Sequence, residues 1–172
     1  VIHNGIRMGT AKGQEWSLFT PGDGEVNLID NNDDGEAEAV IIWSYIPYLV
    51  DYATDDTIYD KIGRNPIKLE NKEYSVFAAD GTRTTIDKIK PFDVISVAYG
   101  VSESDEITIR ISGKEPVSGI YTRDGYSILI GRDEYSLSGW CDLNGAKNGD
   151  NVTIYLDMYN RPVYVTKTSD SE

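Results

Sequence analysis

Apolar and polar residues alternate with a period of two along much of the chain, and this pattern predicts β-strands. Residues 107–111 (Ile-Thr-Ile-Arg-Ile) and 152–157 (Val-Thr-Ile-Tyr-Leu-Asp) alternate over their whole lengths. Residues 39–45 are apolar at most positions, which is typical of a central strand covered on both faces. The same criteria predict further strands over residues 26–29, 74–78, 94–99, 117–121, 127–130 and 162–165.

Turn signals separate these segments, among them Asp80-Gly81, Asp124-Gly125 and the Asn-Gly-Asp of residues 148–150. The chain shows no amphipathic helix longer than about three turns. A short helical turn is expected over residues 85–89, because Pro91 prevents its continuation. The sequence therefore predicts a mainly β protein of antiparallel, hairpin-rich strands.

Residues 90–97 and 147–154 resemble each other, since each has a polar turn, an Asp and an apolar β segment in that order. This repeat suggests one or two small barrel-like units. We expect an N-terminal β unit over residues 1–114 and a small five-stranded barrel-like unit over residues 115–172. The alternative is one continuous β fold in which similar turns recur by chance.

The segment between the strands predicted at 26–29 and 39–45 carries the most specific chemistry. Residues 30–38 read Asp-Asn-Asn-Asp-Asp-Gly-Glu-Ala-Glu, with side-chain oxygens at loop positions one, three, five and nine and glycine at position six. Calcium takes about six to eight oxygen ligands, and acidic loops with this spacing supply them. We therefore expect a Ca²⁺ site at the tip of a hairpin. Its expected ligands are the side chains of Asp30, Asn32, Asp34 and Glu38 and the backbone carbonyl of Glu36.

This loop differs from an EF-hand, because strands flank it and Ile41 occupies position twelve, where an EF-hand has its bidentate acid. The alternative is a solvated turn without an ion, since Asp, Asn and Gly are common in turns. Without an ion, the crowded carboxylates of the loop repel one another.

The chain has 172 residues, a formal net charge of −13 and a pI near 4.4, so its surface is strongly acidic. Such a surface repels phosphate backbones, and we therefore expect no nucleic-acid partner. No apolar run approaches the roughly 20 residues of a membrane span. Because the sequence begins at Val1, we expect a processed form or a fragment of a larger protein.

Residues 26–42, which contain the acidic loop, resemble a segment with the pattern Leu-Ile-Asp-Asn-Asp-x-Asp-Gly-Lys-x-Asp found in surface proteins of Gram-positive bacteria. Many of those proteins also carry S-layer-homology repeats. The resemblance extends to about residue 166 and includes the Gly-Asp-Asn-Val-Thr-Ile-Tyr-Leu-Asp of residues 149–157, although Glu36 and Glu38 replace the Lys and the last Asp of the pattern. It implies an extracellular, cell-surface or cell-wall module that acts as a spacer or adhesive scaffold, with cell-wall or surface-layer components as partners.

The sequence lacks the common catalytic motifs: it has no Gly-x-Ser-x-Gly elbow and no Gly-rich phosphate-binding loop. The only histidine, His3, is expected at the surface near the N-terminus. Cys141 is the single cysteine, which excludes an intrachain disulfide, and we expect it to be half-buried. We therefore predict a non-catalytic structural module, with a hydrolase of unknown class as one alternative.

Another alternative is a carbohydrate- or cell-wall-binding module. Trp43, Tyr45, Tyr48 and Tyr52 lie close together in the sequence, and a sugar-binding platform needs such rings to be exposed and coplanar. The competing interpretation is that these rings pack in a hydrophobic core, as most aromatic side chains in strands do.

Overall fold

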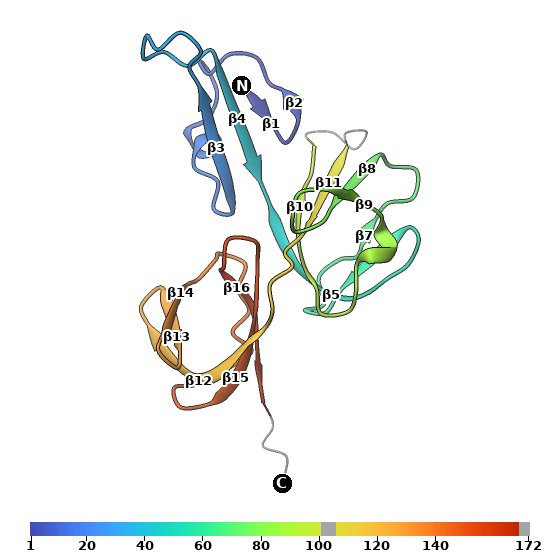
Figure 1. Ribbon diagram of the computed structural model, residues 1–172, viewed down its shortest axis with the longest axis vertical. Coiled ribbons are helices and arrows are strands. Elements are labelled where there is room, and N and C mark those ends of the chain that lie inside the picture. The colour runs from blue at the N-terminus through green and yellow to red at the C-terminus, as the bar shows by residue number, and fades with distance from the viewer. Residues whose placement is uncertain (101–105, 169–172) are drawn as a thin grey trace.

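The computed structural model describes residues 1–100 and 106–168, and the ordered elements of these ranges are β-strands and two short 3-10 helices. The strands form three sheets, which Figure 1 shows one after another along the long axis of the molecule. Most neighbouring strands are antiparallel, so the predicted mainly β, hairpin-rich fold is confirmed. No sheet in the described ranges closes into a barrel, because the outermost strands of each sheet pair on one side only. None of the helices there is long and apolar enough to cross a membrane.

The first sheet carries the acidic loop. It has the order β2-β1-β4-β3, with β1 at Ile2–His3, β2 at Ile6–Arg7, β3 at Gly24–Ile29 and β4 at Ala39–Ser44. The 3-10 helix η1 (Trp16–Phe19) lies in the connection between β2 and β3. β3 and β4 pair antiparallel over their full lengths, so residues 30–38 form the tip of a hairpin. Figure 1 shows this tip at the opposite end of the molecule from the third sheet.

The second sheet has the order β7-β6-β5-β10-β11-β8-β9, and all its pairs are antiparallel except β11 with β8. Its strands are β5 (Ile46–Ala53), β6 (Thr57–Asp60), β7 (Ile67–Lys68), β8 (Tyr74–Phe77), β9 (Arg83–Thr84), β10 (Val94–Ala98) and β11 (Ile107–Ile111). All five residues of β10 are buried, because Ile95 and Val97 face the core of this sheet while Val94 faces the third sheet. The 3-10 helix η2 (Ile86–Lys88) precedes β10, within the predicted helical turn at 85–89.

The third sheet has the order β14-β13-β12-β15-β16 and is antiparallel throughout. Its strands are β12 (Val117–Asp124), β13 (Ser127–Ile130), β14 (Asp133–Ser136), β15 (Asn151–Leu156) and β16 (Pro162–Lys167). Val152, Ile154 and Leu156 alternate into its core, as the period-two pattern predicts. All five strands lie within the unit predicted at 115–172, of which residues 169–172 are outside the described ranges, as are residues 101–105 of the unit predicted at 1–114.

The second and third sheets contain the same five-stranded array. β5, β6, β7, β10 and β11 have the same order and relative directions as β12, β13, β14, β15 and β16. Both arrays also share a pair of backbone hydrogen bonds. In one array, the Val50 carbonyl oxygen accepts the Phe92 N–H, and the Val50 N–H donates to the Asp93 carbonyl oxygen. In the other, the Tyr121 carbonyl oxygen accepts the Gly149 N–H, and the Tyr121 N–H donates to the Asp150 carbonyl oxygen.

The turn into the fourth strand is also the same in both arrays. Oδ2 of Asp93 accepts the Lys90 N–H at 2.8 Å, and Oδ2 of Asp150 accepts the Lys147 N–H at 2.9 Å. These are the turns whose sequences resemble each other at 90–97 and 147–154. The repeat in the sequence therefore corresponds to a repeat in the structure.

The two arrays pack against each other across the short connection at residues 112–116. Leu49, Val94 and Val163 form a buried apolar cluster between them. The buried hydroxyl of Ser112 also donates to the Leu156 carbonyl oxygen at 2.8 Å. Removal of this apolar surface from water favours one fixed arrangement of the arrays.

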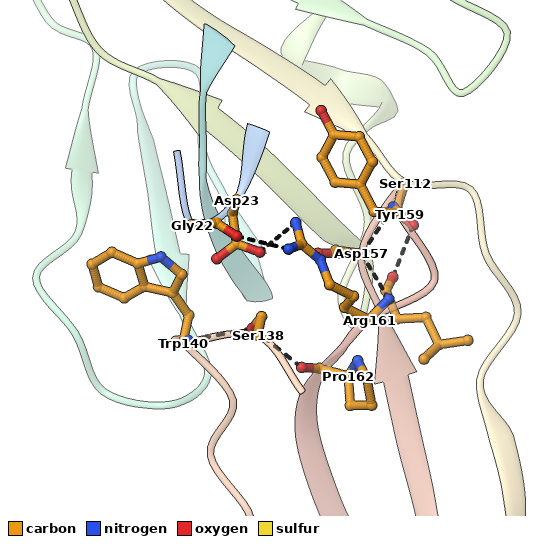
Figure 2. Close-up of polar contacts among 10 residues, drawn as sticks. Gly22, Asp23, Ser112, Ser138, Trp140, Asp157, Tyr159, Arg161 and Pro162 are labelled. Carbon is orange, nitrogen blue, oxygen red and sulfur yellow. Dashed lines mark hydrogen bonds and ion pairs between the residues drawn. The ribbon is translucent and has the colours of Figure 1, made fainter. Parts of the chain in front are cut away.

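Arg161, in the turn between β15 and β16, ties the third sheet to the segment ahead of β3 (Figure 2). Its Nη1 donates to the Gly22 carbonyl oxygen at 2.7 Å, and its Nη2 lies 2.5 Å from Asp23 Oδ1. Its Nε lies 3.4 Å from Oδ2 of Asp157, whose Oδ1 accepts the Tyr159 and Arg161 N–H groups at 2.8 Å. The Asp23 and Asp157 side chains are only 2% and 1% exposed, so one guanidinium is shared by two buried carboxylates and offsets one of their two negative charges.

Candidate functional site

The loop between β3 and β4 brings three carboxylates together. One oxygen from each of Asp30, Asp34 and Glu38 lies within 4.8 Å of the other two, and all three side chains are exposed. Calcium–oxygen distances are about 2.4 Å, so ligands on opposite sides of one ion lie about 4.8 Å apart. The three oxygens are therefore within the span that a single calcium ion bridges.

Backbone N–H groups hold Asp30 inside the loop. Its Oδ2 accepts the Gly35 N–H at 2.9 Å, and its Oδ1 accepts the Asn32 N–H at 3.3 Å. Asp33 and Gly35 have φ values of 58° and 85°, in the left-handed region. Glycine adopts this conformation without steric cost, which explains its place at position six of the loop.

Glu38 and Asp34 are oriented by similar contacts. Oε2 of Glu38 accepts the Asn31 N–H at 2.7 Å, which closes the loop, and Oδ1 of Asp34 accepts the Glu36 N–H at 2.8 Å. The Asn32 Nδ2 donates to Asp34 Oδ2 at 2.9 Å, and the Asn32 Oδ1 accepts the Asp34 N–H at 3.1 Å. Of the five predicted ligands, the structure thus gathers three carboxylates and places Asn32 beside one of them. Metal coordination by all five of these residues, including the Glu36 carbonyl, stays a prediction.

The four aromatic residues considered as a sugar platform lie on or between β4 and β5 without forming one exposed surface. Trp43 and Tyr45 stack with their ring centroids 6.0 Å apart and their planes 9° apart, but Tyr45 is buried. Tyr48 is also buried, whereas Tyr52 is exposed and stacks on Tyr59 instead. The predicted platform of four exposed rings is therefore wrong, because Tyr45 and Tyr48 are buried.

His3 also differs from its expected place at the surface. It lies half-buried on β1, and its Nε2 is 3.1 Å from the Ser44 hydroxyl. Burial lowers the pKa of His3, so the imidazole is neutral at pH 7. Parallel pairing of β1 with β4 explains the position, because it brings the side chain beside the end of β4.

Cys141 is half-buried against the core of the third sheet. Burial, aided by the nearby Asp142 carboxylate, raises the pKa of Cys141 to about 12. Because the thiolate is the reactive form, we expect iodoacetamide at pH 8 to leave Cys141 unmodified in the folded protein and to alkylate it in urea. Mass spectrometry of both samples measures this difference, and equal labelling in both would contradict it.

A further group of residues, two charged and one aromatic, meets where the three sheets approach one another. Asp23, Trp140 and Arg161 come from three distant segments, and no spacing between them signals a shared site. Comparisons of the chain with protein-family models, curated proteins and solved structures find no match. The function proposed below is therefore argued from geometry and from the sequence pattern of the acidic loop.

Proposed function

We propose that the chain is a non-catalytic structural module of a bacterial surface protein, located at the cell surface or in the cell wall, in which Ca²⁺ stiffens the β3–β4 hairpin. The observation that carries this proposal is the approach of Asp30, Asp34 and Glu38 to within 4.8 Å at the hairpin tip. A bound divalent cation removes the repulsion among these three negative charges. Their exposure fits a weak site filled by extracellular calcium, which binds such modules in the millimolar range.

The repeated arrays support a role as a spacer or adhesive scaffold. Two similar five-stranded units follow each other in the chain, and Leu49, Val94 and Val163 pack between them. Such a contact keeps the two units at a fixed distance and angle, which is what a spacer requires. Cell-wall or surface-layer components are the proposed partners, following the resemblance of residues 26–42 to segments of bacterial surface proteins.

Calcium is expected to raise the melting temperature of the protein, because an ion that binds only the folded state stabilises it by mass action. At free calcium ten times above its Kd, the gain in unfolding free energy is about 1.4 kcal/mol. Scanning calorimetry with calcium and with EDTA measures this shift. Asp34→Asn should remove most of it, because Asp34 is one of the three carboxylates that converge.

Asp124→Asn is the matched control. Asp124 is exposed in the β12–β13 hairpin, so the substitution changes the net charge equally without touching the loop. This variant should keep the full calcium response. Superimposable melting curves of the unmodified protein with calcium and with EDTA would refute the calcium proposal.

A further inference from the structure

The chain contains three Asn-Gly pairs, at residues 4–5, 144–145 and 148–149. An asparagine followed by glycine is open to an intrinsic reaction, because glycine has no Cβ to obstruct the approach of its backbone nitrogen to the asparagine side chain. In this reaction the nitrogen attacks Cγ and closes a five-membered succinimide ring. The fold holds the three pairs differently, and this difference decides which of them can react.

Asn4 is fixed in the turn between β1 and β2. The residue is buried, its Nδ2 donates to the Tyr99 carbonyl oxygen at 2.7 Å, and its Oδ1 accepts the Ser44 N–H at 2.8 Å. Rotation of the side-chain amide towards Gly5 would break both hydrogen bonds and leave buried polar groups without partners, which is costly. The fold therefore protects Asn4.

Asn148 is held in the turn that leads into β15. Its Oδ1 accepts the Arg123 N–H at 2.7 Å. The N–H of Gly149, the attacking group of this pair, donates to the Tyr121 carbonyl oxygen at 2.9 Å. Both reacting groups are thus bonded to β12, so neither is free to meet the other.

Asn144 and Gly145 form the exposed tip of a turn in the connection between β14 and β15. Their φ values of 48° and 65°, with a 2.9 Å hydrogen bond from the Ala146 N–H to the Leu143 carbonyl oxygen, are those of a type I′ turn. The N–H of Gly145 takes no part in the hydrogen bond of this turn. Across the ranges that the structure describes, neither this N–H nor the Asn144 side chain has a hydrogen-bond partner.

The turn at residues 4–5 has the same backbone form, so it isolates the effect of the side-chain contacts. It also has two positive φ values, 47° and 83°, and it connects the paired residues His3 and Ile6. The two turns differ in the burial and hydrogen bonding of their asparagines. At Gly145 an added Cβ would meet no atom within 4 Å, so there is space for the movement that ring closure needs. The exposed hydrogen bond across this turn opens in local fluctuations at low cost.

We infer that Asn144 is a site of spontaneous deamidation, through a succinimide formed with Gly145, and that the fold protects Asn4 and Asn148. The Gly145 nitrogen forms a bond to Asn144 Cγ and gives up its proton, and Nδ2 leaves with that proton as ammonia. Water then opens the ring at one of its two carbonyl groups. Opening at one carbonyl gives aspartate, and opening at the other gives isoaspartate, in which the backbone runs through the former side chain.

The modified turn lies against the core of the third sheet. Leu143 and Ala146, at its two ends, pack on that core, and Asp142 joins β16 through two backbone hydrogen bonds of 3.0 Å. Isoaspartate lengthens the backbone of the turn by one methylene group, and either product adds a negative charge two residues from Asp142. Conversion of Asn144 therefore loosens this connection and lowers the stability of the third sheet.

Peptide mapping by mass spectrometry, on the full chain stored in mildly alkaline buffer, tests the inference. We expect Asn144 to be converted at least about tenfold faster than Asn4 and Asn148, because two hydrogen bonds must break before either of those can react. The product should contain isoaspartate as well as aspartate, since direct hydrolysis of the side chain gives aspartate alone. In urea the three asparagines should react at similar rates, because each precedes a glycine.

Asn144→Gln is the control, because glutamine keeps a neutral amide but its longer side chain cannot close the five-membered ring. During storage the melting temperature of the unmodified protein should fall as isoaspartate accumulates, and that of the variant should stay constant. The rates at the three sites are measured without any variant, so the test holds even if this substitution destabilises the turn.

Four results would overturn the inference of a fold-selected site. They are no conversion of Asn144 in the folded protein, equal conversion at all three sites, aspartate as the only product, and the same order of rates in urea as in the folded protein. A constant melting temperature after full conversion would overturn the loosening of the connection.

Discussion

Replacing Arg161 with alanine is expected to lower the unfolding free energy by about 3–5 kcal/mol. The substitution leaves Asp23 and Asp157 buried without the guanidinium that lies between them, and it frees the Gly22 carbonyl oxygen. Removing one partner of a buried ion pair is strongly destabilising because the remaining charge stays out of water. Urea unfolding followed by tryptophan fluorescence and circular dichroism measures the loss.

Two further variants separate charge from packing in this cluster. Arg161→Lys keeps the charge but loses the forked geometry, so it should lose less stability than the alanine variant. Adding Asp23→Asn to Arg161→Ala should restore part of the loss, since the neutral amide needs no counter-charge. Arg132→Ala, at an exposed position between β13 and β14, should change stability by no more than about 0.5 kcal/mol. An equal loss in the Arg161 and Arg132 variants would contradict the proposed role of the cluster.

Strands with strict alternation were predictable from the sequence. The segment predicted at 107–111 is β11 (Ile107–Ile111), and the segment predicted at 152–157 overlaps β15 (Asn151–Leu156). In both, the period of two decides which face enters the core, and a shift of one residue would expose every apolar side chain. The hairpin turns were predictable for a related reason, since Gly81 and Gly125 have the positive φ that their turns require.

The remaining strands depend on their neighbours. β1, β2, β7 and β9 have only two residues each, too few to show a period. β5 contains Pro47, which argues against a central strand because proline cannot donate to a sheet. The structure resolves this conflict, because β6 pairs with β5 only from Val50 onward and Pro47 therefore has a neighbouring strand on one side only.

The acidic loop and the group around Asp23 also differ in how far the sequence alone could predict them. All ligands predicted for the calcium loop lie within residues 30–38, so their spacing could be read directly and the structure gathers three of their carboxylates. The group around Asp23 joins segments that are far apart, as the 139-residue separation between Gly22 and Arg161 shows. Only the packing of the third sheet against the rest of the chain brings them together, and a single sequence holds no local signal for it.

Replacing Gly24 with alanine is expected to lower the unfolding free energy by about 3 kcal/mol, at the upper end of the usual cost of overpacking. A Cβ atom at Gly24 would lie 1.9 Å from the Trp43 carbonyl oxygen and 2.9 Å from its carbonyl carbon. Both are backbone atoms of β4, so they cannot move aside without breaking the pairing that begins with Gly24 opposite Ser44. Hydrogen exchange should show the β3 amide groups losing protection, and urea unfolding gives the size of the effect.

Gly22→Ala is the matched control, because no atom lies within 4 Å of a Cβ added there and the Gly22 carbonyl that accepts from Arg161 is retained. This variant should be as stable as the unmodified protein or slightly more stable, since alanine restricts the unfolded chain.

Asp23 lies between the two glycines, so the Gly24→Ala clash also displaces the carboxylate from Arg161. Gly24→Ala combined with Arg161→Ala should therefore lose less stability than the sum of the single losses, because part of the ion cluster is already disrupted. Full additivity would show that the start of β3 and the ion cluster are energetically independent.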